Sequence, residues 1–337
     1  MKPKLPLVSY EVTMSCNLKC RFCYNHYKNT GDTPQHSSYK MADKTLRRIF
    51  KVFDVGQVTF TGGEPFTAER FGELVLTARL KGAKVSVISN GNFAPVERYV
   101  ELTKLGVNLF ELPVHSYNPD VHDFMTRVKG SHQKSQTIIS ALKNQGVTPT
   151  AVLVLTKFNT ENVAETIRYI HSLGISQMML NRYNIGGEGV INPSEIMPSE
   201  SELKNAFKAI SDEALNLKMT VFSSVCTPMC VLNPADYKGI RFSSCSFDIT
   251  RRPVTIDYLG NLRFCNHSPV VLGNIHTDTP EKIFSNPAAK MWESVVPDYC
   301  KECGKFSVCK AGCRAATQQC GMDLDKPDPI IFYYHQH

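Results

Sequence analysis

The most constraining feature of the chain is a group of three cysteines in the stretch TMSCNLKCRFCYN, residues 13–25. Cys16, Cys20 and Cys23 have the spacing C-x3-C-x2-C. A complete iron–sulfur cube takes four thiolates, one for each iron, so three thiolates leave one iron open to another ligand. A zinc ion completed by a distant fourth residue fits the same spacing. From the spacing alone, iron–sulfur and zinc remain equal alternatives.

Length and composition indicate a globular chain that keeps its cysteines reduced. Its 337 residues exceed the usual size of a single core, so we expect one large domain and a smaller one. The sequence has no stretch of 18 apolar residues, and no long apolar run precedes a small-residue cleavage site near its start. We therefore expect a cytoplasmic protein without a membrane partner. In that compartment its 12 cysteines would serve metal sites or catalysis instead of disulfides.

The net charge of +7 is scattered, with no block of five or six like charges. A solvated surface explains such a charge better than nucleic-acid binding does. A zinc protein that binds nucleic acid is kept as the alternative from another functional class.

Strand-like and helix-like segments alternate six times in the first two thirds of the chain. The strand-like runs are 5–12, 57–63, 84–91, 109–116, 148–156 and 176–184. The helix-like runs are 43–53, 67–81, 95–104, 119–126, 131–145, 161–173 and 199–217. Such alternation predicts a parallel sheet with helices on its outer face. Six units are too few for a closed eight-fold barrel, so we expect an α/β fold with an open, partial (β/α)6 TIM-like barrel over residues 1–224.

Residues 225–337 differ in character, because proline and cysteine become frequent and helical periodicity weakens. Nine of the 12 cysteines lie in 226–320. This composition predicts a small cysteine-rich domain held by metal. The final stretch, DKPDPIIFYYHQH, is expected to fold back onto the body.

The segment CNLKCRFCY directly follows the first expected strand and resembles the signature of the radical S-adenosylmethionine (radical SAM) superfamily. The stretch TFTGGEPF, which ends the second strand, is similar to the GGEP motif of that family. The resemblance implies a cluster on the three cysteines whose open iron chelates the amino and carboxylate groups of SAM. It also implies that the Glu64 carboxylate accepts from the SAM ammonium, while the glycines permit close approach. The residues that the resemblance places against SAM are Phe22, Gly62, Gly63, Glu64, Pro65, Ser89, Asn90, Ser116 and Arg127. For Ser89, Asn90, Ser116 and Arg127, a helix cap or a surface charge is the competing interpretation.

The cysteines of the C-terminal region follow a second pattern. Cys245 precedes Gly260 and Cys265, and these are followed by C-x2-C-x5-C-x3-C and a last cysteine. The order resembles the seven-cysteine SPASM extension, which implies two auxiliary [4Fe-4S] clusters and three clusters in all. By resemblance the outer cluster is held by Cys300, Cys303, Cys309 and Cys320. The inner cluster is assigned Cys245, Cys265 and Cys313.

Two cysteines, Cys226 and Cys230, are left over, although two complete clusters need eight ligands. One of them could be the eighth ligand, and the other a thiol that donates a hydrogen atom to a substrate radical. A buried, inert thiol and an open site on the inner cluster are the alternatives. Asn266 stands at the position where sulfatase-activating members of the resembled family have an aspartate base, and an amide cannot accept the proton. His267, the next residue, could act as the base instead and is a further candidate catalytic residue. A sulfatase-type reaction is therefore disfavoured.

The resemblance implies that SAM is reductively split into methionine and a 5′-deoxyadenosyl radical, which removes a hydrogen atom from a substrate carbon. We expect post-translational modification of a ribosomal peptide by oxidation, crosslinking or epimerisation. The alternative is the same chemistry on a small molecule such as an aminoglycoside, a tetrapyrrole or an amino-acid derivative. Expected partners are a reductant such as flavodoxin or ferredoxin and, because only 15 residues precede Cys16, a separate peptide-recognition protein.

Overall fold

The computed structural model describes residues 2–25 and 37–335. Its centre is an 11-stranded sheet with the order β11-β10-β9-β1-β2-β3-β4-β5-β6-β7-β8. The strands are β1 (Lys4–Thr13), β2 (Asp54–Gly62), β3 (Lys84–Ile88), β4 (Leu109–Pro113), β5 (Thr150–Leu155), β6 (Gln177–Arg182), β7 (Thr220–Ser223), β8 (Ile240–Phe242), β9 (Val254–Asp257), β10 (Asn261–Arg263) and β11 (Val271–Asn274). Strands β1 to β8 are parallel, and β9 pairs in parallel with the other side of β1.

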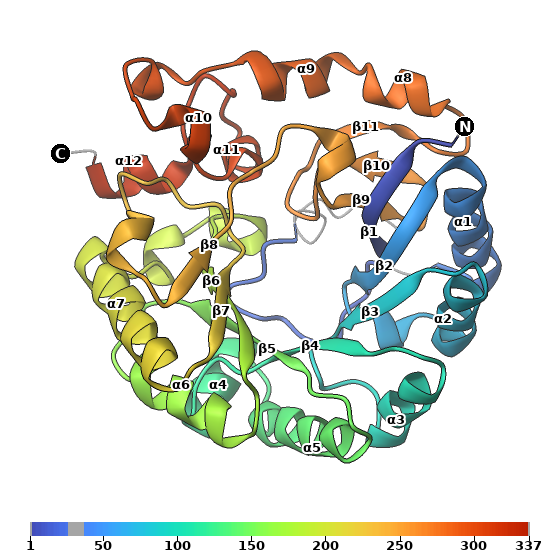
Figure 1. The fold of residues 1–337 in the computed structure, drawn as a ribbon, viewed down its shortest axis with the longest axis horizontal. Coiled ribbons are helices and arrows are strands. Elements are labelled where there is room, and N and C mark those ends of the chain that lie inside the picture. Colours follow the sequence, from blue (N-terminus) through green and yellow to red (C-terminus); the bar gives the residue numbers. More distant parts are fainter. Residues whose placement is uncertain (1, 26–36, 336–337) are drawn as a thin grey trace.

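Helices α1 to α7 connect strands β1 to β7 and lie outside the curved sheet (Figure 1), and α8 to α12 follow the later strands. The helices are α1 (Tyr39–Val52), α2 (Phe71–Leu80), α3 (Val96–Lys104), α4 (Pro119–Thr126), α5 (Ser131–Asn144), α6 (Val163–Ser172), α7 (Glu200–Asn216), α8 (Pro280–Phe284), α9 (Pro287–Ser294), α10 (Phe306–Cys309), α11 (Arg314–Gln319) and α12 (Pro329–His335). The six expected βα units are thus confirmed. None of the helices in the described ranges has the length and apolarity needed to cross a lipid bilayer.

Local sequence explains where the outer helices begin and which side they bury. Helix α1 starts at Ser38, whose side chain accepts from the backbone N–H of Met41, and its apolar side faces the sheet. Helix α7 starts with a reciprocal capping box between Ser199 and Glu202. Strand β1 has a parallel neighbour on each side, β2 and β9, and so lies inside the sheet.

The sheet extends beyond the six strands expected from the sequence. The short strands β7 and β8 continue it past β6, and β9 joins it through the pairs Val8–Val254 to Glu11–Asp257. The antiparallel strands β10 and β11 then form its far edge. A division of the chain at residue 224 stays a prediction, and the sheet itself runs across that position.

Two buried ion pairs fasten the C-terminal part to the barrel strands. Arg263 on β10 pairs with Glu11 on β1, and Arg182 on β6 pairs with Asp328, just before α12. Helix α12 also packs on the body, since the Tyr334 hydroxyl donates to the carbonyl of Pro198 at 2.9 Å. The expectation that the C-terminal stretch folds back is confirmed for its described residues.

The parallel arrangement decides where polar side chains can gather. All carboxyl ends of β1 to β6 lie at one rim, so the loops after these strands meet there. The three N-terminal cysteines, the GGEP turn and the Ser89–Asn90 loop follow β1, β2 and β3 in that order. This rim is therefore the place to look for a site.

Candidate active site and metal centres

The three-cysteine loop after β1 is fastened to the end of α4. The backbone N–H of Arg21 donates to the carbonyl of Met125 at 3.0 Å, and its Nε donates to that of Phe124 at 3.1 Å. The Arg21 guanidinium also lies 4.0 Å from the centre of the Phe124 ring. Phe22 packs edge-on against His115, with ring centres 4.6 Å apart. The loop is thereby held on the rim, and Phe22 helps to position it.

Polar hydrogens are directed at the first sulfur of the loop. The backbone N–H of Leu18 lies 3.4 Å from Cys16 Sγ, and Asn90 Nδ2 lies 3.7 Å from the same atom. Asn90 also donates to Asn17 Oδ1 at 2.9 Å. N–H donors of this kind orient thiolate ligands and tune iron–sulfur sites. Asn90, predicted as a SAM contact, thus lies beside the cysteine loop.

The two glycines of the GGEP turn allow the end of β2 to approach the cysteine loop. A Cβ at Gly62, where φ is +130°, would lie 2.0 Å from the Thr13 carbonyl oxygen. A Cβ at Gly63 would lie 2.0 Å from the Ser15 carbonyl oxygen. The N–H of Gly63 donates to Thr13 O at 2.9 Å. The glycines are therefore needed for contact between two backbone segments, and their contact with SAM stays a prediction.

Glu64 is fully buried and organises the neighbouring loop. Its Oε1 accepts from Ser89 Oγ at 2.8 Å and from the N–H of Phe66 at 3.3 Å, and its Oε2 accepts from the N–H of Asn90 at 2.7 Å. Burial raises the pKa of the carboxyl group to about 7, although these donors oppose the shift. Pro65 follows as the first residue of the short helix η2 (Pro65–Thr67). Glu64 thus joins the GGEP turn to the Ser89–Asn90 loop.

We expect Glu64→Gln to lower the free energy of unfolding by about 2 kcal/mol at pH 8, because an amide NH2 would face donors and the charge-assisted hydrogen bonds would be lost. Urea denaturation of the reconstituted protein measures this. The exposed Glu97 in the first turn of α3 supplies the control, since Glu97→Gln should change stability by less than about 0.5 kcal/mol. Equal stability of Glu64→Gln and the unchanged protein would contradict the role given to the carboxylate.

The remaining predicted SAM contacts occupy structural positions on the rim. Ser89 Oγ also lies 2.6 Å from the Tyr99 hydroxyl, and Ser116 Oγ accepts from the N–H of Asn118 at 3.1 Å. Arg127 is exposed and ends α4 in the left-handed conformation, with φ of +59°. The helix-cap interpretation therefore describes Arg127, and the contacts of these residues with SAM stay predictions.

A polar network connects the cysteine loop with the C-terminal region. Tyr24, which directly follows Cys23, stacks on His267 with ring centres 3.8 Å apart. Asn266 Nδ2 donates to the Tyr24 hydroxyl. Gln319 Nε2 donates to the carbonyl of His267 at 2.6 Å and to that of Tyr24 at 3.2 Å. His267 thus lies at the junction of the two regions, with Asn266 serving as a donor.

Several residues of this site were not predicted from the sequence. Glu111 on β4 is one, and burial raises the pKa of its carboxyl group to about 7. Glu111 alternates along β4 with the core residues Phe110 and Leu112, so its side chain lies on the inner face of the sheet. Glu111 could have been found in the sequence as a polar residue within the otherwise apolar segment LFELP. Tyr24 could have been found as the residue directly after Cys23. No sequence signal marks Gln319.

The inner cysteines form one group together with Cys226. The Cys226 thiol and the Cys245 sulfur share a hydrogen bond, which lowers the pKa of Cys245 to about 6, with Arg252 as a further cause and burial opposing it. Arg252 Nη1 lies 3.5 Å from Cys245 Sγ. Asn184 Nδ2 lies 3.2 Å from Cys313 Sγ and also 3.2 Å from Nδ1 of His267, two residues after Cys265. An arginine and an amide donor beside thiols fit a thiolate-ligated cluster.

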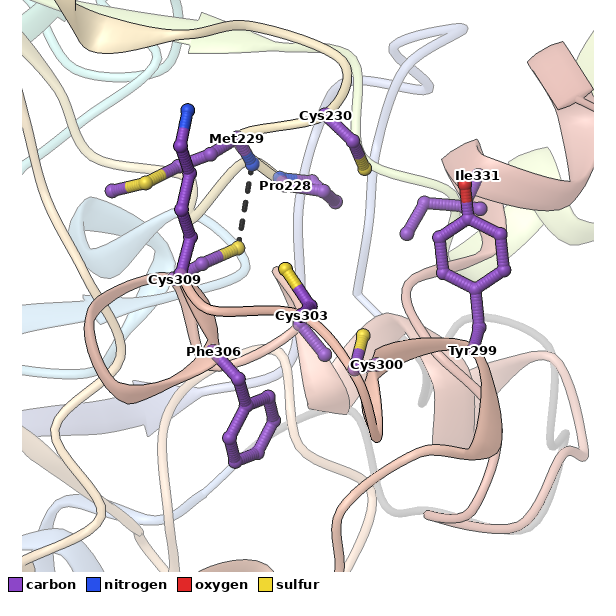
Figure 2. Close-up of a pocket in the computed structure, with 11 residues that line it drawn as sticks. Pro228, Met229, Cys230, Tyr299, Cys300, Cys303, Phe306, Cys309 and Ile331 are labelled. Carbon is purple, nitrogen blue, oxygen red and sulfur yellow. Dashed lines mark hydrogen bonds between the residues drawn. The ribbon is translucent and has the colours of Figure 1, made fainter.

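The outer cysteines surround a cavity of about 190 Å³. Figure 2 shows the sulfur atoms around one common space. The cysteines lining it are Cys230, Cys300, Cys303 and Cys309. The backbone N–H of Met229 donates to Cys309 Sγ at 3.3 Å. Cys320 is not among the described residues that line this cavity. Its assignment to the outer cluster stays a prediction.

All 12 cysteines lie in the described ranges, and none of them forms a disulfide. Among the described residues, no three His, Cys, Asp or Glu side chains lie close enough together to hold a single metal ion. An iron–sulfur cube spaces its thiolates more widely than a single ion does, because each cysteine binds a different iron.

Comparison with known proteins agrees with this arrangement. The profile of the Radical SAM superfamily matches residues 10–185, and that of an iron–sulfur cluster-binding domain, SPASM, matches residues 245–309. A PqqA peptide cyclase of Granulibacter bethesdensis is 21% identical over 98% of this chain and 87% of its own length.

Two solved structures share the fold. One is native anSMEcpe with bound AdoMet, which has a TM-score of 0.74 at 18% identity and covers 98% of this chain and 94% of that chain. The other is Streptococcus suis SuiB bound to precursor peptide SuiA, with a TM-score of 0.73 at 17% identity and coverage of 97% and 75%. The predicted partial barrel followed by a SPASM region is confirmed.

The family profile covers more than half of the chain, and the cysteine loop, the GGEP turn and the Ser89–Asn90 loop meet at the rim as the resemblance implies. The chain belongs to the radical SAM superfamily.

Proposed function

We propose that this protein is a radical SAM/SPASM enzyme that post-translationally modifies a ribosomal peptide. The observation that carries the proposal is the meeting of the cysteine loop with Glu64 and Asn90 at the rim, next to the network that leads to the C-terminal thiols. The names of two similar proteins support a peptide as substrate, since one is a PqqA peptide cyclase and the other was solved with a precursor peptide.

In this proposal a [4Fe-4S] cluster on Cys16, Cys20 and Cys23, when bound with SAM and reduced, supplies the 5′-deoxyadenosyl radical that removes a hydrogen atom from the substrate. The chain positions and encloses these groups. Asn90 Nδ2 is directed at Cys16 Sγ, and Glu64 fixes the loop that carries Asn90. Contacts of SAM with the GGEP turn, Ser89, Ser116 and Arg127 belong to the proposal.

The interior of the barrel gives the substrate polar neighbours close to the cysteine loop. Tyr24 and His267 are stacked, and Glu111 lies on the inner face of β4, since it alternates with the core residues Phe110 and Leu112. Burial raises the pKa of Glu111 to about 7, so this group exchanges a proton near neutral pH. We propose Glu111 and His267 as the groups that face the reacting part of the peptide.

Two auxiliary [4Fe-4S] clusters, a flavodoxin or ferredoxin as reductant and a separate peptide-recognition protein complete the proposal. A cytoplasmic location fits it, because that compartment keeps the 12 thiols reduced.

The test is formation of 5′-deoxyadenosine by anaerobically reconstituted protein given SAM, a reductant and candidate precursor peptides. We expect nucleoside release that rises with the correct peptide and matches peptide modification, read as loss of two hydrogens or as deuterium uptake from solvent. The Cys20→Ala variant is the control and should release no nucleoside.

The outcomes separate the parts of the proposal. Turnover on a sugar or a tetrapyrrole and on no peptide would overturn the peptide substrate. Failure of fully iron-loaded protein to release any nucleoside would overturn the SAM chemistry itself.

A further inference from the structure

We propose a division of the C-terminal thiols that differs from the one the family pattern implies. Four cysteines hold the outer cluster: Cys230, Cys300, Cys303 and Cys309. Four others hold the inner cluster: Cys226, Cys245, Cys265 and Cys313. Cys320 is a ligand of neither cluster. The inference rests on the proposed function only in taking the C-terminal region to hold iron–sulfur clusters.

The outer group is carried by the shape of its cavity. The cavity of about 190 Å³ has Cys230 on one side and the 300–309 segment on the other, so the sulfur atoms face a common space (Figure 2). Four thiols around one partly open cavity match the ligand count of a cube, one thiolate for each iron.

The inner group is carried by hydrogen bonds that join its cysteines through Arg182 and Asn184. Arg182 donates from Nη2 to the carbonyl of Cys226 at 3.1 Å and from Nη1 to Asn184 Oδ1 at 3.2 Å. Asn184 Nδ2 lies 3.2 Å from Cys313 Sγ and also 3.2 Å from Nδ1 of His267, two residues after Cys265. Arg252, which is buried, lies against Cys245 and supplies a positive charge for a set of thiolates. Cys226 is therefore the fourth protein ligand of the inner cluster, for which the sequence pattern supplies three.

The short segment from Cys226 to Cys230 explains how two neighbouring cysteines serve different groups. Arg182 Nη2 donates to the carbonyl of Cys226 at 3.1 Å, which holds the first cysteine towards the barrel. The N–H of Met229 donates to Cys309 Sγ at 3.3 Å, which holds the second part of the segment against the outer group. The segment thus runs between the two sets of thiols and contributes one sulfur to each.

Cys320 lies apart from the outer group. Helix α11 separates Cys313 at its start from Cys320 at its end, a distance of about 10 Å along a helix of this length. The preceding residue, Gln319, accepts from the N–H of Gly187, after β6, and donates to the carbonyls of Tyr24 and His267. Cys320 is not among the described residues that line the outer cavity. Its place beside β6 leaves Cys230 as the fourth outer ligand.

The first test counts iron in the full chain without its N-terminal cluster. Anaerobically reconstituted C16A/C20A/C23A should hold about eight irons, the content of two cubes. Adding Cys230→Ala should lower the count by about one to four irons and remove one reduced-cluster signal from the electron paramagnetic resonance spectrum, because a cube that loses a thiolate loses one or more irons. Cys226→Ala should act in the same way on the other signal. The matched control is Cys320→Ala, which should leave both the count and the spectrum unchanged.

A second measurement needs no substitution and so does not depend on whether a variant folds. Iodoacetamide labelling of the anaerobic holoprotein, mapped by mass spectrometry, should spare Cys230, whereas the slow labelling of the partly buried Cys320 should be the same before and after removal of iron. Removal of iron with a chelator and an oxidant should then expose Cys230 to labelling. Protection of Cys320 by the clusters, or loss of iron in Cys320→Ala with eight irons kept in Cys230→Ala, would overturn the proposed division.

Failure of this inference is distinguishable from failure of the proposed function. Iron content and labelling are read without SAM or peptide, so neither depends on turnover. A C-terminal region that binds zinc and no iron would overturn both, whereas clusters that depend on Cys320 would overturn this inference alone.

Discussion

Replacing Arg182 by methionine should lower the free energy of unfolding by about 3–5 kcal/mol, because it would leave the Asp328 carboxylate buried without its cation. Both side chains are 1% exposed. Arg182 also donates from Nε to Thr227 Oγ1 at 3.0 Å and from Nη2 to the carbonyl of Cys226. Asp328 in turn accepts from the N–H of Cys313 at 2.7 Å. The pair therefore holds β6, the 226–227 segment and the start of α11 together.

Urea denaturation of the anaerobic holoprotein measures this effect. Arg168→Met is the matched control, since Arg168 makes exposed ion pairs with Glu165 and Glu213 and its loss should change stability by less than about 1 kcal/mol. The double variant R182M/D328N should be more stable than the sum of the single effects predicts, because neither charge is then left alone in the interior. Additive effects would show that the two side chains do not act as a pair.

Local patterns were sufficient to predict the first six strands and their helices. Each strand-like run is apolar and is followed by a helix-like run, so type and order follow from periodicity. Strands β7 and β8 could not be predicted in this way, because four and three residues carry little pattern. Strand β9 owes its place to pairing with β1, from which it is separated by more than 240 residues, and no local signal reports such a contact.

The cysteine loops were predictable because spacing is a property of the sequence itself. The spatial grouping of Cys226, Cys230 and Cys320 was not, because it depends on where the 226–230 segment and α11 lie in the folded chain. Gln319 shows the same limit. Its amide joins the backbone of Tyr24 to that of His267, and the three residues lie far apart in the sequence.

Polar groups that face the barrel interior are hard to predict for a related reason. Glu11 lies within an apolar strand and is stabilised by Arg263, which is 252 positions away. Glu64 was placed correctly in the GGEP turn, but its hydrogen bonds to Ser89 and Asn90 depend on the pairing of β2 with β3. The GGEP motif thus identified Glu64, whereas its hydrogen-bond partners follow only from the pairing of the strands in the sheet.

Replacing Glu111 by glutamine should stabilise the protein by on the order of 3 kcal/mol at pH 8 and by less than about 1 kcal/mol at pH 5. Burial raises the pKa of this carboxyl group from 4.5 to about 7 in the folded protein. At pH 5 and below, the folded group is protonated and costs little. Between about pH 4.5 and 7 the carboxyl group ionises in the unfolded chain but stays protonated in the folded protein, so the unfolded state gains relative to the folded one. Above pH 7 the group ionises in both states and the cost stays constant. The neutral amide avoids that cost.

Denaturation of Glu111→Gln and the unchanged protein across pH 5 to 8 tests the sign as well as the size of this effect. The difference between the two should grow with rising pH and level off above pH 7. Glu64→Gln makes a sharp comparison, since burial also raises the pKa of Glu64 to about 7 but its oxygens accept from Ser89, Asn90 and Phe66. At position 64 the glutamine amide would lose hydrogen bonds that the carboxylate accepts, so Glu64→Gln should destabilise the protein. A Glu111→Gln protein whose advantage is the same at pH 5 and pH 8 would show that Glu111 does not titrate near neutral pH. Glu111 would then no longer be a candidate for the proton-exchanging group of the proposed site.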